Sequence, residues 1–211
     1  MRILFTVFAF ATLLLLERTF ASPLIAKRMP EAHSNNLVFI GYRQVPVFIS
    51  IRFMFLNLQK RTATIYNKKN TLVYTTREYT QLGKGAYLTR RLGDWEEDYV
   101  CAVYADAAKL APAKKLWLDN YERESPVREE VIKTKLKMKE KSIHKVILVS
   151  GIWGSDDRYS EVQMLIPPYL LADKHSIGKL GIYVTCVPWD NRAELPTNED
   201  ADWGSLSIVG Y

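Results

Sequence analysis

The chain has 211 residues, of which 48% are hydrophobic and 12% aromatic, and its formal net charge is +6. This length allows one domain with a substantial core, and the aromatic content excludes disorder over most of the chain. The positive charge is modest and concentrated in residues 133–145. It suits an acidic ligand but is too weak to indicate a nucleic-acid partner.

Residues 1–21 have the three parts of a secretory signal peptide. Arg2 precedes an apolar run from Ile3 to Leu16, and the small residues Thr19 and Ala21 mark a cleavage site. A membrane anchor is the less favoured alternative, because the run is short for a hydrocarbon core of roughly 30 Å. We therefore expect a secreted, extracellular protein that has no membrane contact after cleavage and starts with a flexible leader at 22–36.

The remaining residues, 37–211, are expected to form a single domain built mainly from short strands. Runs rich in β-branched and aromatic residues, bounded by turn residues, predict these strands. They cover residues 37–43, 71–75, the end of 82–89, 99–105, 114–118, 146–149, 163–166 and 180–187. With one or two helices added, the fold class is α+β, dominated by sheet.

Two segments favour helix. Residues 62–67 are compatible with one, and a second should start at Ser125-Pro126, because Ser is a favoured N-cap and Pro suits the first turn. Its narrow apolar stripe consists of Val127, Val131 and Ile132.

Residues 47–56 are intensely hydrophobic but follow neither a helical nor an alternating period. The segment is too short to span a membrane, and its composition slightly favours a buried strand.

Cys101 and Cys186 are the only cysteines. In an oxidising compartment such a pair most often forms a disulfide, with two buried thiols as the alternative. The bridge would contribute about 4 kcal/mol through the loop that it closes. No metal site is expected, since His33, His144 and His175 have no second ligand at a suitable spacing.

Three short motifs could bind a ligand. Arg43 ends the first strand, where its planar donors could hold a phosphate. In the segment 82–89, Gly83 and Gly85 permit a close backbone approach, and Tyr87 offers a flat ring. In the third motif, at 161–168, two polar side chains share one face of a strand. They are Glu161 and Gln163.

In this order the motifs resemble the ADP-ribosyltransferase superfamily, of secreted toxin and fungal effector type. The resemblance implies a bent, split β-sandwich that binds NAD in its cleft. We expect a monomer whose partner is a protein target. Arg43 would then bind a phosphate or ribose of NAD. Gly83 and Gly85 would let the protein backbone come close to NAD, and Tyr87 would stack on nicotinamide. Position 163 would stabilise the positive charge of the transition state.

The sequence departs from this family pattern in two places. Gln163 stands where the family has Glu, and a neutral amide cannot offset a positive charge, so weakened or lost transfer is expected. Glu161 could substitute in part, and the alternative function is an inactive binding module on the same fold. Residues 46–61 form the second departure, because they resemble an insertion between the Arg strand and the helix with Tyr66 and Asn67.

Overall fold

A computed structural model describes residues 36–45, 52–75, 80–94, 98–152, 161–173 and 178–211. The expected signal peptide and most of the leader lie outside these ranges. Within them the protein is α+β, and seven strands form one sheet in the order β4-β5-β6-β2-β1-β3-β7. All neighbouring strands are antiparallel except β4 and β5, which are parallel.

The strands lie close to the segments predicted for them. Their bounds are β1 Leu37–Val45, β2 Ala86–Thr89, β3 Tyr99–Asp106, β4 Lys115–Trp117, β5 Ile147–Gly151, β6 Val162–Ile166 and β7 Tyr183–Pro188. The α-helices are α2 Arg52–Lys69, α3 Ala107–Leu110 and α4 Val127–Leu136, and the 3-10 helices are η1 Asn120–Glu122, η2 Glu140–Lys145, η3 Pro168–Leu170, η4 Trp189–Glu194 and η5 Gly204–Leu206.

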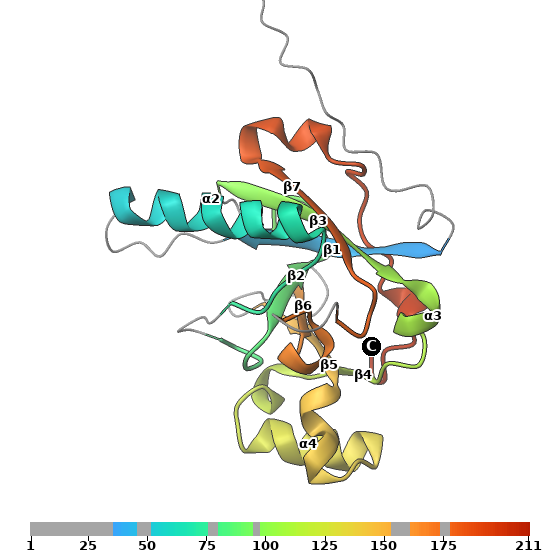
Figure 1. Ribbon diagram of the computed structural model, residues 1–211. Coiled ribbons are helices and arrows are strands. Elements are labelled where there is room, and N and C mark those ends of the chain that lie inside the picture. Colours follow the sequence, from blue (N-terminus) through green and yellow to red (C-terminus); the bar gives the residue numbers. More distant parts are fainter. Residues whose placement is uncertain (1–35, 46–51, 76–79, 95–97, 153–160, 174–177) are drawn as a thin grey trace, which may run out of the picture.

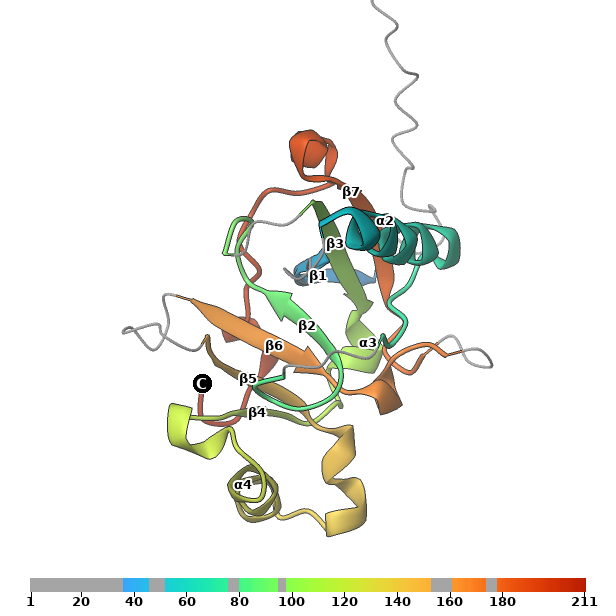
Figure 2. The same cartoon turned by 90° about the vertical axis from the view of Figure 1, so that its left-hand side faces the viewer.

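The sheet has two halves that separate between β1 and β2. Figures 1 and 2 show β1, β3 and β7 with α2 in one half, and β4, β5 and β6 with α4 in the other. β1 pairs with β3 from Leu37 to Val45, with a register shift between Phe39 and Gly41, whereas it meets β2 only where Tyr42 lies opposite Thr89. The backbone groups of β1 and β2 beyond this pair therefore need other partners.

Alternation along the strands gives each sheet face its own core. One face carries the largest apolar cluster, to which Ala63 and Tyr66 of α2 belong. The opposite face carries two smaller clusters. One lies beneath Ile132 of α4, and the other is centred on Tyr42 and Tyr104.

The predicted disulfide joins Cys101 of β3 to Cys186 of β7, with an S–S distance of 2.04 Å. The two residues lie directly opposite each other in the ladder, with their Cα atoms 3.9 Å apart. Such a short separation is typical of a non-hydrogen-bonded pair, in which side chains come closest. The bridge therefore fastens the edge strand β7 to the sheet.

The expected strand at 47–56 is wrong where the structure describes it. Helix α2 starts at Arg52 and continues through the segment 62–67 that was predicted as helical. No Gly or Pro interrupts residues 52–69, and a short apolar run does not distinguish a buried strand from a helix. Residues 46–51 lie outside the described residues.

Two further predictions need correction. Residues 71–75 form no strand, because Val73 makes only an isolated bridge to Ala172. Ser125 is not the N-cap of α4: Pro126 takes that position, and the Ser125 hydroxyl instead donates to Glu129 Oε1. Val127 is 46% exposed and so does not belong to the predicted apolar stripe, although Ile132 is buried.

Candidate functional site

The three sequence motifs lie on three adjacent strands. Arg43 is on β1, Tyr87 and Thr89 are on β2, and Gln163 is on β6. Tyr42 lies opposite Thr89, which in turn lies opposite Gln163. Segments that are about 40 and 120 residues apart in sequence are thus neighbours at the point where the sheet divides (Figure 2).

The side chain of Arg43 reaches from β1 to the backbone of β2. It is only 2% exposed, and its Nη1 donates to the carbonyl oxygen of Tyr87 at 2.9 Å. Its Nε has no hydrogen-bond partner, and no acidic side chain in the described ranges forms an ion pair with it. A buried guanidinium without a counter-ion is costly, so this group could receive an anionic ligand.

Two buried polar residues on β1 and β2 were missed by the sequence reasoning. Gln44 and Thr89 are both buried, and the Thr89 hydroxyl lies 3.1 Å from Gln44 Oε1 and 3.1 Å from the carbonyl oxygen of Arg91. The Nε2 of Gln44 has no partner. Thr89 could have been found from the alternation, because it follows Tyr87 by two residues and shares its face.

The side chain of Tyr87 forms hydrogen bonds with the backbone at the start of the glycine segment. The hydroxyl of Tyr87 donates to the carbonyl oxygen of Gly83 at 2.8 Å and accepts from the backbone N–H of Leu82 at 2.9 Å. The Tyr87 ring is 3% exposed and belongs to the apolar cluster below α4. The structure therefore gives this ring a packing role, and stacking on a ligand stays a prediction.

Gly85 has no room for a side chain. A Cβ atom there would clash with the carbonyl oxygen of Ile166 and would lie 2.5 Å from Leu165 Cδ1. Gly83 has a φ of +101°, and a Cβ there would lie 3.4 Å from the guanidinium of Arg128. Glycine at 85 is thus required by the close approach of β6, whereas glycine at 83 is required by the backbone conformation.

Gln163 is 1% exposed, and both of its amide hydrogens have acceptors inside the protein. Nε2 donates to the carbonyl oxygen of Gly151 at 3.2 Å and to Oε1 of Gln81. Gln81 Oε1 also accepts from Nη1 of Arg123 at 3.2 Å. Two acceptor oxygens face position 163, so the surroundings suit an amide and would repel a carboxylate.

Arg123 is a second buried arginine near this site, and the sequence reasoning missed it as well. Its Nη2 donates to Asn120 Oδ1, whereas its Nε has no partner. Burial lowers the pKa of its guanidinium. Through Gln81 it connects to Gln163, so the polar network reaches from β6 to the turn before α4.

Glu161 directly precedes β6 and is exposed, unlike Gln163 two residues later. Its charge acts on Asp94: burial is the main cause of the raised pKa of Asp94, and repulsion by Glu161 adds to it. Arg91 opposes the shift, with its Nε 3.1 Å from Asp94 Oδ1. Glu161 thus belongs to a charged group at the rim rather than to the buried network.

Neither a metal cluster nor a membrane-crossing helix is found among the described residues. Comparison with known proteins gives one family. Residues 80–211 match a family of unknown function, DUF5910, and the chain belongs to it. The match includes the glycine segment, Gln163 and both cysteines, whereas Arg43 precedes it. No curated protein matches the chain.

Proposed function

We propose that the protein is a secreted ADP-ribosyltransferase-like domain that binds NAD where β1, β2 and β6 meet. The observation that supports this most is the register that aligns Tyr42, Thr89 and Gln163 across three strands, so that the strands carrying the predicted motifs are neighbours. The division of the sheet at the same point agrees with the split sandwich that the sequence resemblance implies.

Arg43 is the residue that would bind the diphosphate of NAD. Its Nε is buried without a partner, and a phosphate oxygen would supply both the missing acceptor and the missing negative charge. Gly83 and Gly85 would allow the ligand to approach the backbone before β2. The buried ring of Tyr87 fits the proposal less well, since it would have to leave its cluster to stack on nicotinamide.

In ADP-ribosyl transfer, the bond between nicotinamide and the ribose carbon breaks, and that carbon becomes positively charged. A nucleophile of the protein target then bonds to the carbon and loses its proton. Gln163 cannot neutralise this charge, so transfer by the natural chain is slow or absent. Glu161, two residues before Gln163 in the chain, is the carboxylate that could take part.

A second candidate function is a binding module without catalysis. It is favoured by the amide hydrogens of Gln163, which both bond inside the protein rather than point at a ligand. In this case the buried network around Gln163 holds the sheet together, and the partner is a protein bound elsewhere on the surface.

NAD binding by calorimetry and nicotinamide release distinguish these functions. The natural protein should bind NAD, and Arg43→Met should weaken binding by roughly 10-fold or more through loss of a charge-assisted contact. Arg192→Met, at an exposed position, is the matched control. Gln163→Glu should raise nicotinamide release above that of the natural chain, and adding Glu161→Gln tests the second carboxylate. Absence of NAD binding by all of these variants, when folded, would favour the binding module.

Secretion has its own test. The disulfide agrees with an oxidising compartment, and cleavage after Ala21 would make Ser22 the first residue of the mature protein. Mass spectrometry of the secreted protein should find that N-terminus. Retention of residues 1–21 would instead support the membrane-anchor alternative.

A further inference from the structure

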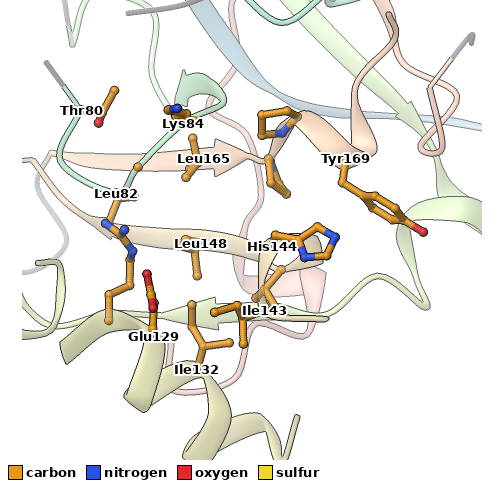
Figure 3. Close-up of a pocket in the computed structure, with 15 residues that line it drawn as sticks. Thr80, Leu82, Lys84, Glu129, Ile132, Ile143, His144, Leu148, Leu165 and Tyr169 are labelled. Atoms are coloured by element: carbon orange, nitrogen blue, oxygen red, sulfur yellow. The ribbon is translucent and has the colours of Figure 1, made fainter. Parts of the chain in front are cut away.

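A cavity of about 580 Å³ lies beside the glycine segment, between β6 and α4. Figure 3 shows Leu165 and Leu148 of the sheet on one wall and Ile132 and Ile143 on the other. His144 and Tyr169 lie together at one end. A volume of this size is typical of small-molecule sites.

The walls of the cavity are apolar. Six of the residues that line it belong to the cluster below α4 or pack against it. They are Leu82, Ile132, Ile143, Val146, Leu148 and Leu165. Such a surface favours a hydrocarbon or aromatic group over a polar one, because burial of apolar area drives the association.

The rim of the cavity is mainly cationic. Lys84 and Arg128 line it, and no acidic side chain in the described part of the chain forms an ion pair with either. Glu129 is the one acidic residue among the described residues that line the cavity. Lys145 and Lys179 add positive charge at the end where Tyr169 lies, with their Nζ atoms 4.7 and 3.2 Å from the centre of its ring. The rim therefore attracts an anion.

We propose that this cavity binds a small amphipathic anion, with its apolar part between the sheet and α4 and its acidic group at Lys84 and Arg128. The site differs from the proposed NAD site. It shares Gly83 with that site, but it contains neither Arg43 nor Gln163. A dinucleotide also has the wrong chemistry for it, because its sugars and diphosphate would lie against leucine and isoleucine side chains.

The test uses the mature protein, with anilinonaphthalene sulfonate as a fluorescent probe and dodecanoate as a competitor. We expect the probe to bind and dodecanoate to displace it, whereas neutral dodecanol should compete roughly 10-fold more weakly because it lacks the charge. NAD should leave the probe in place. Displacement by NAD at concentrations that saturate its own binding would overturn the inference of a separate site.

Two variants test the position of the probe. Ile143→Trp fills the cavity from a partly buried position, and Lys84→Glu reverses a charge at the exposed rim. Each should weaken probe binding by roughly 5-fold or more. Lys141→Glu is the control, because Lys141 is exposed, lies on the same 3-10 helix as Ile143 and does not line the cavity. Equal affinity of the natural protein and both variants, each shown to be folded by circular dichroism, would refute the site.

Discussion

The side-chain amide of Asn67 binds both backbone groups of Cys186. Its Nδ2 donates to the Cys186 carbonyl oxygen at 2.8 Å, and its Oδ1 accepts from the Cys186 N–H at 2.8 Å. Because Cys186 is in a non-hydrogen-bonded pair with Cys101, these groups point away from β3, at the open edge of the sheet. Helix α2 thereby covers the edge strand at the residue that carries the disulfide.

Replacement of Asn67 tests this contact. Asn67→Ala leaves two partly buried backbone groups without their partners and should lower the free energy of unfolding by about 1–3 kcal/mol. Asn67→Asp keeps the acceptor but loses the donor, so its loss should be intermediate. Lys68→Ala, on the exposed side of the same helix, is the control and should change little. Urea denaturation measures all three, and equal stability of Asn67→Ala and the natural protein would contradict the role.

The tie between Asn67 and Cys186 also shows what the sequence can predict and what it cannot. The helical segment with Tyr66 and Asn67 and the strand with Cys186 were both predicted, since each has a clear local pattern. Their contact joins residues 119 positions apart, and no local period encodes it. The start of α2 could not be predicted either, because the apolar run at 47–56 is compatible with a helix as well as with a buried strand.

The candidate site was predicted to a similar extent. Its place at a strand end singled out Arg43, glycine content singled out Gly85, and alternation singled out Gln163. The structure places β1, β2 and β6, which carry or follow these residues, side by side. The hydrogen bonds of Gln163 could not be predicted, because one of its acceptors belongs to Gln81, which is 82 positions earlier. Tyr87 was predicted to face a ligand, but the apolar residues around its ring come from β5, β6 and α4, which only the fold assembles.

The disulfide should contribute strongly to stability, because it closes a loop with a sequence separation of 85. Reduction of the Cys101–Cys186 bridge should lower the free energy of unfolding by about 4 kcal/mol. Denaturation with and without reductant measures the difference. The double variant Cys101→Ala, Cys186→Ala is the control and should give the same value in both conditions. The prediction fails if the natural protein, with its thiols shown to be reduced, is as stable as the oxidised form.

Alkaline pH should destabilise the protein through two buried tyrosines. Burial, with repulsion from the neighbouring phenols, raises the pKa of Tyr42 to about 12 and that of Tyr104 to about 12. The unfolded chain loses these protons near pH 10, so their contribution is complete below about pH 10 and is lost as the pH rises toward about 12.

Tyr42→Phe separates this effect from other alkaline changes. The variant loses the hydrogen bond to the Glu199 carbonyl oxygen, so it should be less stable near pH 8 by about 1 kcal/mol. Its stability should then fall less steeply above about pH 10, with Tyr104 responsible for the remaining decline. Tyr121→Phe, at a residue that is 75% exposed, is the control. Identical slopes for the natural protein and Tyr42→Phe would exclude Tyr42 as a cause.

Gly85→Ala should disrupt the pairing of β2 with β6. Its methyl group would push on the Ile166 carbonyl, and Ile166 is the ladder partner of Ala86. We expect a loss of more than about 2 kcal/mol in the free energy of unfolding. Gly93→Ala is the matched control: its φ is +106° but its Cβ would meet nothing within 4 Å, so it measures backbone strain alone, about 1 kcal/mol. Similar losses in both variants would argue against the clash.

Finally, the charge of Arg123 should decide how well position 163 tolerates a carboxylate. Gln81 Oε1 accepts hydrogen bonds from both Arg123 and Gln163. Gln163→Glu would therefore place a negative charge that only the Gln81 side chain separates from a buried guanidinium. This attraction offsets part of the desolvation of the carboxylate. Gln163→Glu should therefore be less destabilising in the natural background than in Arg123→Met, with a coupling energy of about 0.5–3 kcal/mol.

The uncharged pair Gln163→Met with Arg123→Met controls for simple loss of the network and should couple less. Chemical denaturation of the single and double variants measures the free energies of unfolding that both double-mutant cycles need. If the losses in the free energy of unfolding are additive in the Gln163→Glu cycle, the charge of Arg123 does not interact with the carboxylate at position 163. A positive coupling would mean that the fold still holds a cation suited to an acidic residue at this point of β6, as expected if a catalytic carboxylate was replaced by Gln.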